Sequence, residues 1–318
     1  MMKARLALPV MLCAAVLAGC RQPGFPAHHG SAVTAPPKAV EAKLPGRTGS
    51  YIGVYERGAP ESYRLINQFA GAVGQQPGTV VYYSGWYERF QAGFARQARA
   101  HGAVPLIQME PKGISMSAVA AGRYDPYLIS YASAVRGYGK PVIIGFAHEM
   151  NGPWYGWGYG HTSPRTWVAA WRHVVTVFRQ QGAGNVTWLW TLNRAGRKTG
   201  SVRDWWPGAS YVTWVGIDGY YIQPGDTFST AFQPTIAAVR EFTTKPILLS
   251  EVGIGQVSGQ AAKIPDLFAG IRQDHLLGVV WFDVTQHSGI YHQDWRLEGN
   301  PAAIAAFRAG MRSLKTAL

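Results

Sequence analysis

The sequence predicts an α/β fold, a (β/α)8 TIM barrel that forms a single domain. Eight short apolar segments typical of buried strands alternate with segments of helical periodicity, which is the pattern of a barrel of parallel strands. The chain has 318 residues, enough for a barrel of about 250 residues and an N-terminal leader. No Gly-rich phosphate loop follows the first strand, which disfavours an open dinucleotide-binding sheet.

The predicted strands are short apolar runs that end at polar or small residues. In chain order they are 51–55, 79–84, 104–109, 141–147, 186–192, 212–218, 246–250 and 278–283. The predicted helices between and after them are 60–73, 88–101, 124–137, 163–181, 228–242, 263–273 and 301–315. These strands and helices alternate with no other internal repeat, so the sequence predicts a single catalytic domain.

The N-terminus is typical of an export signal. Lys3 and Arg5 precede an apolar stretch, residues 6–17, that is too short for a stable membrane span. Leu17–Cys20 resembles a bacterial lipobox, so residues 1–19 are predicted to be a signal peptide and Cys20 to carry lipid. Residues 20–49 are rich in Pro, Ala, Gly and Ser and are predicted to be a flexible tether, with the barrel at 50–318.

A lipoprotein signal predicts an extracytoplasmic protein that is anchored to the cell membrane by lipid. The alternative is an ordinary secretory signal in which Cys20 is incidental. Cys13 and Cys20 are the two cysteines of the chain. Removal of the signal therefore excludes an internal disulfide, and no cysteine-based metal site is expected.

The composition narrows the class of partner. The formal net charge is +13, but Lys and Arg are spread along the chain without a polybasic run, so we expect no nucleic-acid partner. The 12 Trp and 16 Tyr exceed what packing usually requires and favour a stacking surface. We expect a monomer that needs no cofactor.

Two glutamates end predicted strands and form the candidate catalytic pair. Glu149 follows the fourth strand and Glu251 follows the seventh. Active sites of such barrels lie at the C-terminal ends of the strands, so both carboxylates are expected at one mouth. Hydrolysis of a glycosidic bond requires two carboxyl groups, one protonated and one ionised.

The surroundings of each glutamate assign its role. His148, Trp154 and Trp157 surround Glu149 in sequence, and this apolar setting favours the proton-transfer role. Glu251 lies on a polar turn, which suits a nucleophile kept ionised by a donor such as Tyr220. Trp86 and Tyr155 are further candidates for stacking against sugar rings.

The motif His148–Gly152 followed by Trp154–Gly158 resembles the acid/base motif of glycoside hydrolase family 26. Ile217–Tyr220 and Leu249–Gly253 follow at the expected order and spacing, and the resemblance covers about residues 49–312. The resemblance implies a retaining barrel hydrolase, most often an endo-acting β-1,4-mannanase, with Glu149 as acid/base and Glu251 as nucleophile. It also implies that His148 bonds substrate or nucleophile and that Tyr220 orients Glu251. Trp154 or Trp157 would line the subsites beside the cleaved bond, and Trp281 would be an aromatic platform beneath the reacting sugar.

The sequence leaves the substrate open. β-1,4-Mannan leads, mixed-linkage β-1,3-1,4-glucan or β-1,3-xylan is the runner-up, and a non-catalytic surface protein that binds glycan is the alternative from another class. Gly156 stands where the commoner form of the motif has an aromatic residue. The histidines show no metal-ligand spacing and no Gly-x-Ser-x-Gly elbow occurs, so neither a metal site nor an esterase triad is predicted.

Overall fold

A computed structural model describes residues 44–196, 199–256, 259–286 and 293–315. By their contacts, all of these residues belong to one compact unit, residues 36–318. The predicted signal, Cys20 and most of the predicted tether lie outside the described residues. Leu44 packs against the barrel and Tyr51 donates a hydrogen bond to the Pro45 carbonyl at 2.8 Å, so the last residues assigned to the tether contact the fold.

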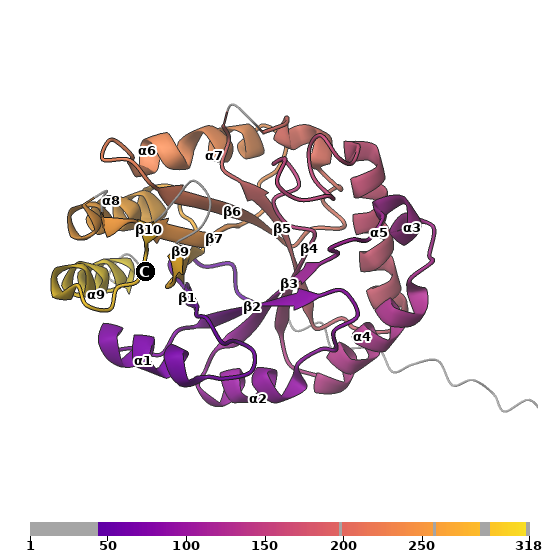
Figure 1. The fold of residues 1–318 in the computed structure, drawn as a ribbon, viewed down its shortest axis with the longest axis horizontal. Helices are drawn as coiled ribbons and strands as arrows, with labels where there is room; N and C mark the ends of the chain where they lie inside the picture. The colour runs from indigo at the N-terminus through magenta and orange to yellow at the C-terminus, as the bar shows by residue number, and fades with distance from the viewer. Residues whose placement is uncertain (1–43, 197–198, 257–258, 287–292, 316–318) are drawn as a thin grey trace, which may run out of the picture. The chain divides into compact units, whose positions relative to one another are not determined.

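The predicted (β/α)8 barrel is confirmed. Among the described residues, eight parallel strands close in chain order, with the eighth beside the first (Figure 1). The strands are β1 (Tyr51–Tyr55), β2 (Thr79–Gly85), β3 (Val104–Glu110), β4 (Val142–Phe146), β5 (Val186–Asn193), β6 (Trp214–Tyr221), β7 (Ile247–Ile254) and β8 (Gly278–Phe282).

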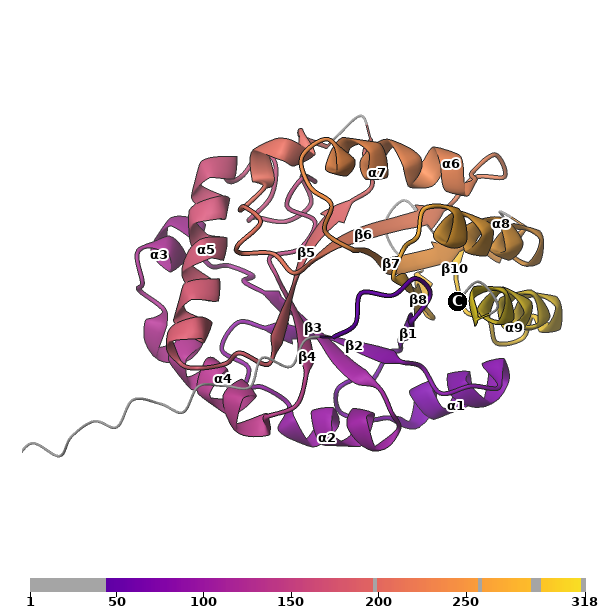
Figure 2. The same ribbon diagram turned by 180° about the vertical axis from the view of Figure 1, so that it is seen from behind.

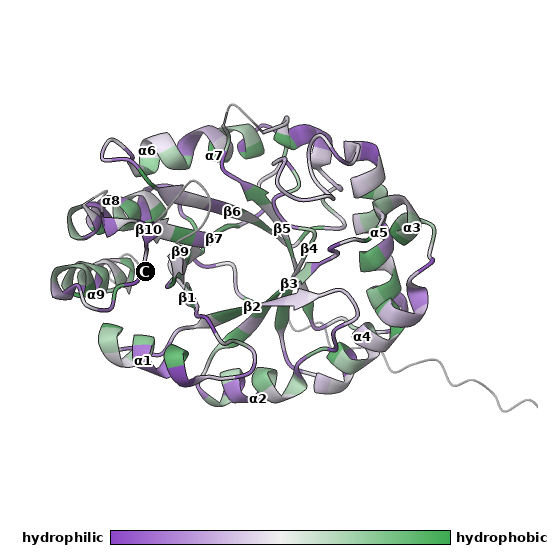
Figure 3. Ribbon diagram, viewed as in Figure 1, coloured by the Kyte–Doolittle hydropathy of each residue, from purple (hydrophilic) through white to green (hydrophobic). Residues whose placement is uncertain are grey.

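Helices surround the barrel, as the views from the two sides show (Figures 1 and 2). They are α1 (Arg64–Val73), α2 (Ala92–Ala100), α3 (Met116–Ala120), α4 (Asp125–Tyr138), α5 (Pro164–Gln180), the 3-10 helix η1 (Val202–Trp205), α6 (Phe228–Ala231), α7 (Gln233–Arg240), α8 (Gln260–Gln273) and α9 (Pro301–Lys315). Hydrophobic and hydrophilic residues alternate along these helices (Figure 3), because one face of each packs on the strands.

The helices differ from the prediction in three places. The predicted helix 228–242 is two helices, α6 and α7, which meet at Phe232. Pro234 lies in the first turn of α7, where its missing N–H costs no hydrogen bond. The short helices α3 and η1 and a two-stranded sheet of β9 (Thr285–Gln286) and β10 (Gln293–Asp294) were not predicted, since segments of this length carry no clear periodicity.

Strand alternation decides which side chains enter the barrel. An inner layer includes Val81 and Val280, which lie with Leu277, the residue before β8, and with six other buried residues of the barrel strands: Tyr51, Leu106, Ile143, Leu189, Trp214 and Leu248. Two residues further along their strands, Tyr83 and Phe282 line the cavity at the barrel mouth. The period of two therefore places alternate residues of each strand on the path to the site.

A β-bulge interrupts this alternation in β7. Ile217 of β6 pairs with Leu249, but the next residue, Asp218, pairs with Glu251, so Ser250 is an extra residue in the strand. Ser250 Oγ donates to Asp218 Oδ1 at 2.6 Å in the barrel interior, and Glu251 lines the cavity. The bulge thus turns two consecutive side chains toward the interior, as bulges beside active sites often do. Glu251 lies within β7 rather than after it.

Candidate active site

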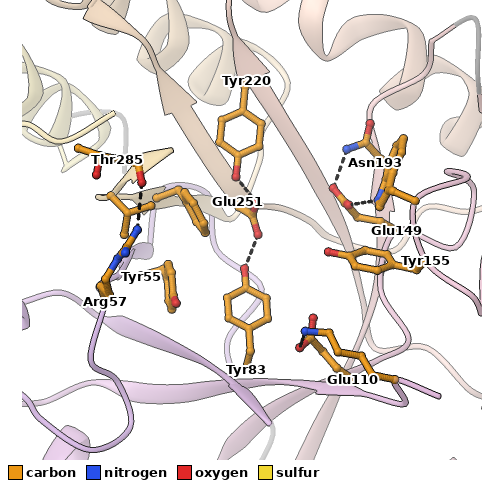
Figure 4. A pocket seen from close by; sticks show the side chains of 14 residues that line it. Tyr55, Arg57, Tyr83, Glu110, Glu149, Tyr155, Asn193, Tyr220, Glu251 and Thr285 are labelled. Atoms are coloured by element: carbon orange, nitrogen blue, oxygen red, sulfur yellow. Dashed lines mark hydrogen bonds and ion pairs between the residues drawn. The ribbon is translucent and has the colours of Figure 1, made fainter. Parts of the chain in front are cut away.

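A cavity of about 910 Å³ opens at the C-terminal ends of the strands. Glu149 and Glu251 both line it, and half of the other lining side chains are aromatic: Tyr55, Tyr83, Trp154, Tyr155, Tyr220 and Phe282. Figure 4 shows the two carboxylates within this cavity, with Tyr155 directed between them. The structure therefore brings the predicted pair together in an aromatic setting.

Two phenols hold Glu251. Tyr83 of β2 donates to one carboxylate oxygen and Tyr220 of β6 donates to the other. The two rings approach from opposite sides (Figure 4), so they fix the plane of the carboxylate. Both phenol pKa values are raised well above the ordinary value, mainly by burial, and the rings remain neutral donors.

Two donors also reach Glu149. Asn193 Nδ2 donates to Oε1 at 2.6 Å, and the indole Nε1 of Trp154 donates to Oε2 at 2.6 Å. Gly152 makes room for this indole, because a Cβ at that position would lie 2.2 Å from the ring. The carboxyl group of Glu149 is thereby fixed at the cavity wall.

The backbone that carries Glu149 is held in an unusual conformation. Ala147 has φ 48° and Glu149 has φ 52°, a region that L-residues seldom adopt. Glu149 N donates to the Thr191 carbonyl at 2.9 Å, while Asn151 and the Asn193 backbone exchange two hydrogen bonds of 2.8 and 2.9 Å. These bonds to β5 hold the strained segment, which is the expected behaviour of backbone strain at a functional site.

The two carboxyl groups differ in how strongly their surroundings favour the ionised form. Burial, followed by the charge of Glu251, raises the pKa of Glu149 to about 8, although Asn193 and Trp154 act in the opposite direction. Burial also raises the pKa of Glu251, but the two phenol donors counteract it. The arrangement favours a protonated Glu149 beside an ionised Glu251, as an acid and a nucleophile require.

The predicted aromatic and histidine residues divide between the cavity and its support. Trp154 and Tyr155 line the cavity, and Trp154 remains 46% exposed. Trp157 is buried, stacks on Tyr155 with ring centres 4.3 Å apart, and donates to the His148 carbonyl at 2.8 Å. The prediction that Trp157 lines a subsite is therefore wrong, since it supports Tyr155 from behind.

His148 also lies behind the wall. Its side chain is 2% exposed, does not line the cavity, and packs against Tyr83 and Tyr155. Burial, with a smaller effect of the Lys112 charge, lowers its pKa to about 3, so the ring is neutral. Among the described residues no hydrogen bond joins His148 to Glu251, and the histidine packs behind Tyr83 and Tyr155, two residues that do line the cavity.

Trp281 and Trp86 do not reach the cavity, contrary to prediction. Trp281 is fully buried, donates to the Trp295 carbonyl at 2.9 Å and packs on Phe307 of α9. Its neighbour Phe282 has the inward position on β8 instead. Trp86 packs among other aromatic rings, those of Tyr87, Tyr124, Tyr127 and Phe146, outside the lining residues.

Sequence reasoning missed several residues of the site. Tyr83 and Asn193 bond the two carboxylates, yet each lies within an apolar strand and outside any motif. Strand alternation was the available signal, because Tyr83 follows the interior residue Val81 by two positions. Arg57 donates to the Thr285 carbonyl at 3.0 Å and Lys112 pairs with Glu110 at 2.8 Å, which places two cations at the cavity.

A closed parallel barrel with two held carboxylates in an aromatic cavity at its C-terminal mouth has the features of the barrel glycoside hydrolases. The chain belongs to glycosyl hydrolase family 26, whose sequence model matches residues 129–310, more than half of the chain.

Similar proteins support this assignment. Endoglucanase H of Acetivibrio thermocellus is 29% identical over 82% of this chain and 30% of its own length. A mannan endo-1,4-beta-mannosidase of Bacillus subtilis is 24% identical over 62% of this chain and 57% of its own. The chain thus spans less than two thirds of the length of these relatives. The catalytic domain of an endo-beta-1,4-mannanase from Bacillus sp. JAMB-750 shares the fold, with a TM-score of 0.63 at 17% identity over 83% of this chain and 86% of that one.

Proposed function

We propose that the chain is an endo-acting glycoside hydrolase that cleaves β-1,4-mannan with retention of anomeric configuration. The observation behind the proposal is that Glu149 and Glu251 line one cavity and that hydrogen bonds fix both carboxyl groups there. The family and its mannan-cleaving relative in Bacillus subtilis support the choice of substrate. The exposed indole of Trp154 beside Glu149 suits the C–H face of a sugar ring.

The proposed reaction has two steps. Protonated Glu149 gives its proton to the glycosidic oxygen as that bond breaks, and ionised Glu251 attacks the anomeric carbon to form a glycosyl ester. Glu149, now ionised, removes a proton from water, and the water oxygen displaces Glu251 from the sugar. Tyr83 and Tyr220 hold the attacking carboxylate, and Asn193 and Trp154 hold the acid.

The experiment is product analysis with the full chain on β-1,4-mannan, mixed-linkage β-glucan and β-1,3-xylan. We expect internal cleavage of mannan, and NMR of the first products should show the anomer of the substrate linkage. Glu251→Gln should abolish product formation, while Glu241→Gln, at an exposed glutamate, should not. Inverted products would overturn the two-step mechanism.

β-Glucan is the second candidate substrate, because Endoglucanase H matches a larger share of this chain than the mannosidase does. Cleavage of mixed-linkage glucan without cleavage of mannan would replace the first choice. Binding to a glycan without turnover in either wild type or Glu251→Gln would favour the non-catalytic surface protein.

We also propose that the protein is exported and held at the cell membrane by lipid on Cys20. The support is the sequence of residues 1–20, which resembles a lipoprotein signal. No helix among the described residues has the length and apolar character needed to cross a membrane. Cys20→Ala should shift the protein from the membrane fraction to the soluble fraction, and unchanged fractionation would contradict the anchor. A monomer is expected from sedimentation of the solubilised protein.

A further inference from the structure

A second group of carboxylates lies where the barrel closes. Glu56 directly follows β1 and Asp283 directly follows β8, two strands whose last residues, Tyr55 and Phe282, are paired. Glu298, on the segment before α9, joins them. One carboxylate oxygen from each residue lies within 4.8 Å of the other two.

Ordinary partners do not account for this group. Glu56 is 4% exposed and Asp283 is 1% exposed, and their carboxyl groups face each other. Glu56 Oε1 and Asp283 Oδ2 receive no well-aligned hydrogen bond from an N–H or hydroxyl group in the part of the chain that the structure describes. The nearby cation of Arg296 forms two hydrogen bonds with Asp294. Like charges opposite each other on neighbouring strands destabilise a sheet, and buried charges require compensation.

The electrostatics agrees with this geometry. Glu56 and Asp283 are buried beside each other, and burial disfavours two ionised carboxylates that have no counter-charge. Either a proton or a cation must therefore compensate the negative charge of the cluster near neutral pH. A shared proton serves two of the three carboxylates, whereas a metal ion can accept oxygens from all three.

We propose that Glu56, Asp283 and Glu298 form a calcium site. Calcium binds carboxylate oxygens at about 2.3–2.6 Å, so two ligands on opposite sides of one ion lie about 4.8 Å apart. The three oxygens of the cluster lie no farther apart than this span, so they could reach one ion together. Leu297 N donates to Asp283 Oδ1 at 2.8 Å, which fixes the carboxylate and leaves Oδ2 for the ion.

The ion would join three parts of the chain that are distant in sequence. It would link the ends of β1 and β8 with the segment before α9. Tyr55 and Phe282, the residues beside Glu56 and Asp283, stack with ring centres 4.9 Å apart and line the cavity. Calcium would therefore stabilise the barrel seam and the adjoining wall, a role that lies beyond the proposed catalytic function.

The test is binding of calcium to the full chain after treatment with EDTA. Titration calorimetry should give one ion per chain, and free calcium at about 100-fold over Kd should raise Tm by about 5–10 °C. Magnesium should bind more weakly, because it demands a tighter octahedral shell. No calcium-dependent heat and no change in Tm would overturn the site, leaving a shared proton as the compensation.

A variant localises the effect. Glu298→Gln, at the least buried of the three, should fold and weaken calcium binding at least about tenfold, while Glu61→Gln, at an exposed glutamate, should bind as wild type does. Calcium binding unchanged by Glu298→Gln would place the ion elsewhere and overturn the proposal. Both readouts are independent of hydrolysis, so failure here leaves the proposed function untouched.

Discussion

Tyr83 and Tyr220 are the residues through which the barrel holds Glu251, the proposed nucleophile. Each phenol donates to one oxygen of Glu251 from a different strand, β2 or β6. A hydrogen bond to a charged group contributes about 1.5–3 kcal/mol. Because both bonds favour the ionised carboxylate, they keep the pKa of a buried glutamate from rising further.

Tyr83→Phe should reduce kcat/KM by about 10–100-fold, since one charge-assisted bond is lost. The pKa of Glu251 should rise, and activity that requires its ionised form should then begin at a higher pH, by about one to two pH units. The measurement is the pH profile of kcat/KM. Tyr138→Phe, whose hydroxyl bonds the Ala95 carbonyl, is the control, and an acid limb unmoved in Tyr83→Phe would remove this role.

Glu149→Gln should reduce kcat on polysaccharide by about 10²–10⁴-fold, the usual contribution of a general acid. The loss in the first step should be much smaller on an aryl glycoside whose leaving group needs no proton. Wild-type activity should fall as pH rises through about 8, because Glu149 loses its proton there. Equal losses on both substrates would contradict the acid role of Glu149.

At the scale of single elements, β6 and β7 depend on small residues inside the barrel. A Cβ on Gly216 would lie 2.5 Å from Ser250 Oγ and 2.6 Å from Thr191 Oγ1. The bulged Ser250 therefore occupies the space that a side chain at 216 would need. This is how the strand that carries Glu251 can turn Ser250 inward as well.

Gly216→Ala should lower the free energy of unfolding by about 1–3 kcal/mol through overpacking. Gly93→Ala is the matched control, because Gly93 lies in α2 and an added Cβ would meet nothing within 4 Å. It should be neutral or stabilise by up to about 1 kcal/mol. Denaturant unfolding measures both, and equal stability of the two variants would show that the interior tolerates the extra carbon.

The strand pattern explains how far the sequence could predict the site. All eight barrel strands were predicted, because buried parallel strands form apolar runs that stand out in sequence. The inward face was not assigned, so Trp281 was chosen over Phe282 and Tyr83 was missed.

The bulge at Ser250 was not predictable either, since it depends on pairing with Asp218 of β6. The cluster of Glu56, Asp283 and Glu298 joins residues that no local motif connects.

At the scale of the whole molecule, the barrel mouth contains several carboxyl groups whose burial disfavours their ionised forms. Burial is the largest cause that raises the pKa values of Glu149, Asp218 and Glu251. Such groups bind protons in the folded state that they release in the unfolded chain. The site that supports catalysis therefore reduces stability as pH rises.

For Glu149 the affected window extends from about pH 4.5, the ordinary value, to about pH 8. Within it the folded state binds more protons than the unfolded state, so the free energy of unfolding falls as pH rises. In Glu149→Gln this titration is absent, and Tm measured in EDTA should fall less steeply between pH 5 and 8 than in wild type. Glu241→Gln should keep the wild-type slope, since its exposed carboxylate is not buried on folding. If Glu149→Gln keeps that slope too, the proton on Glu149 is not linked to folding, and the burial of its carboxyl group does not oppose stability.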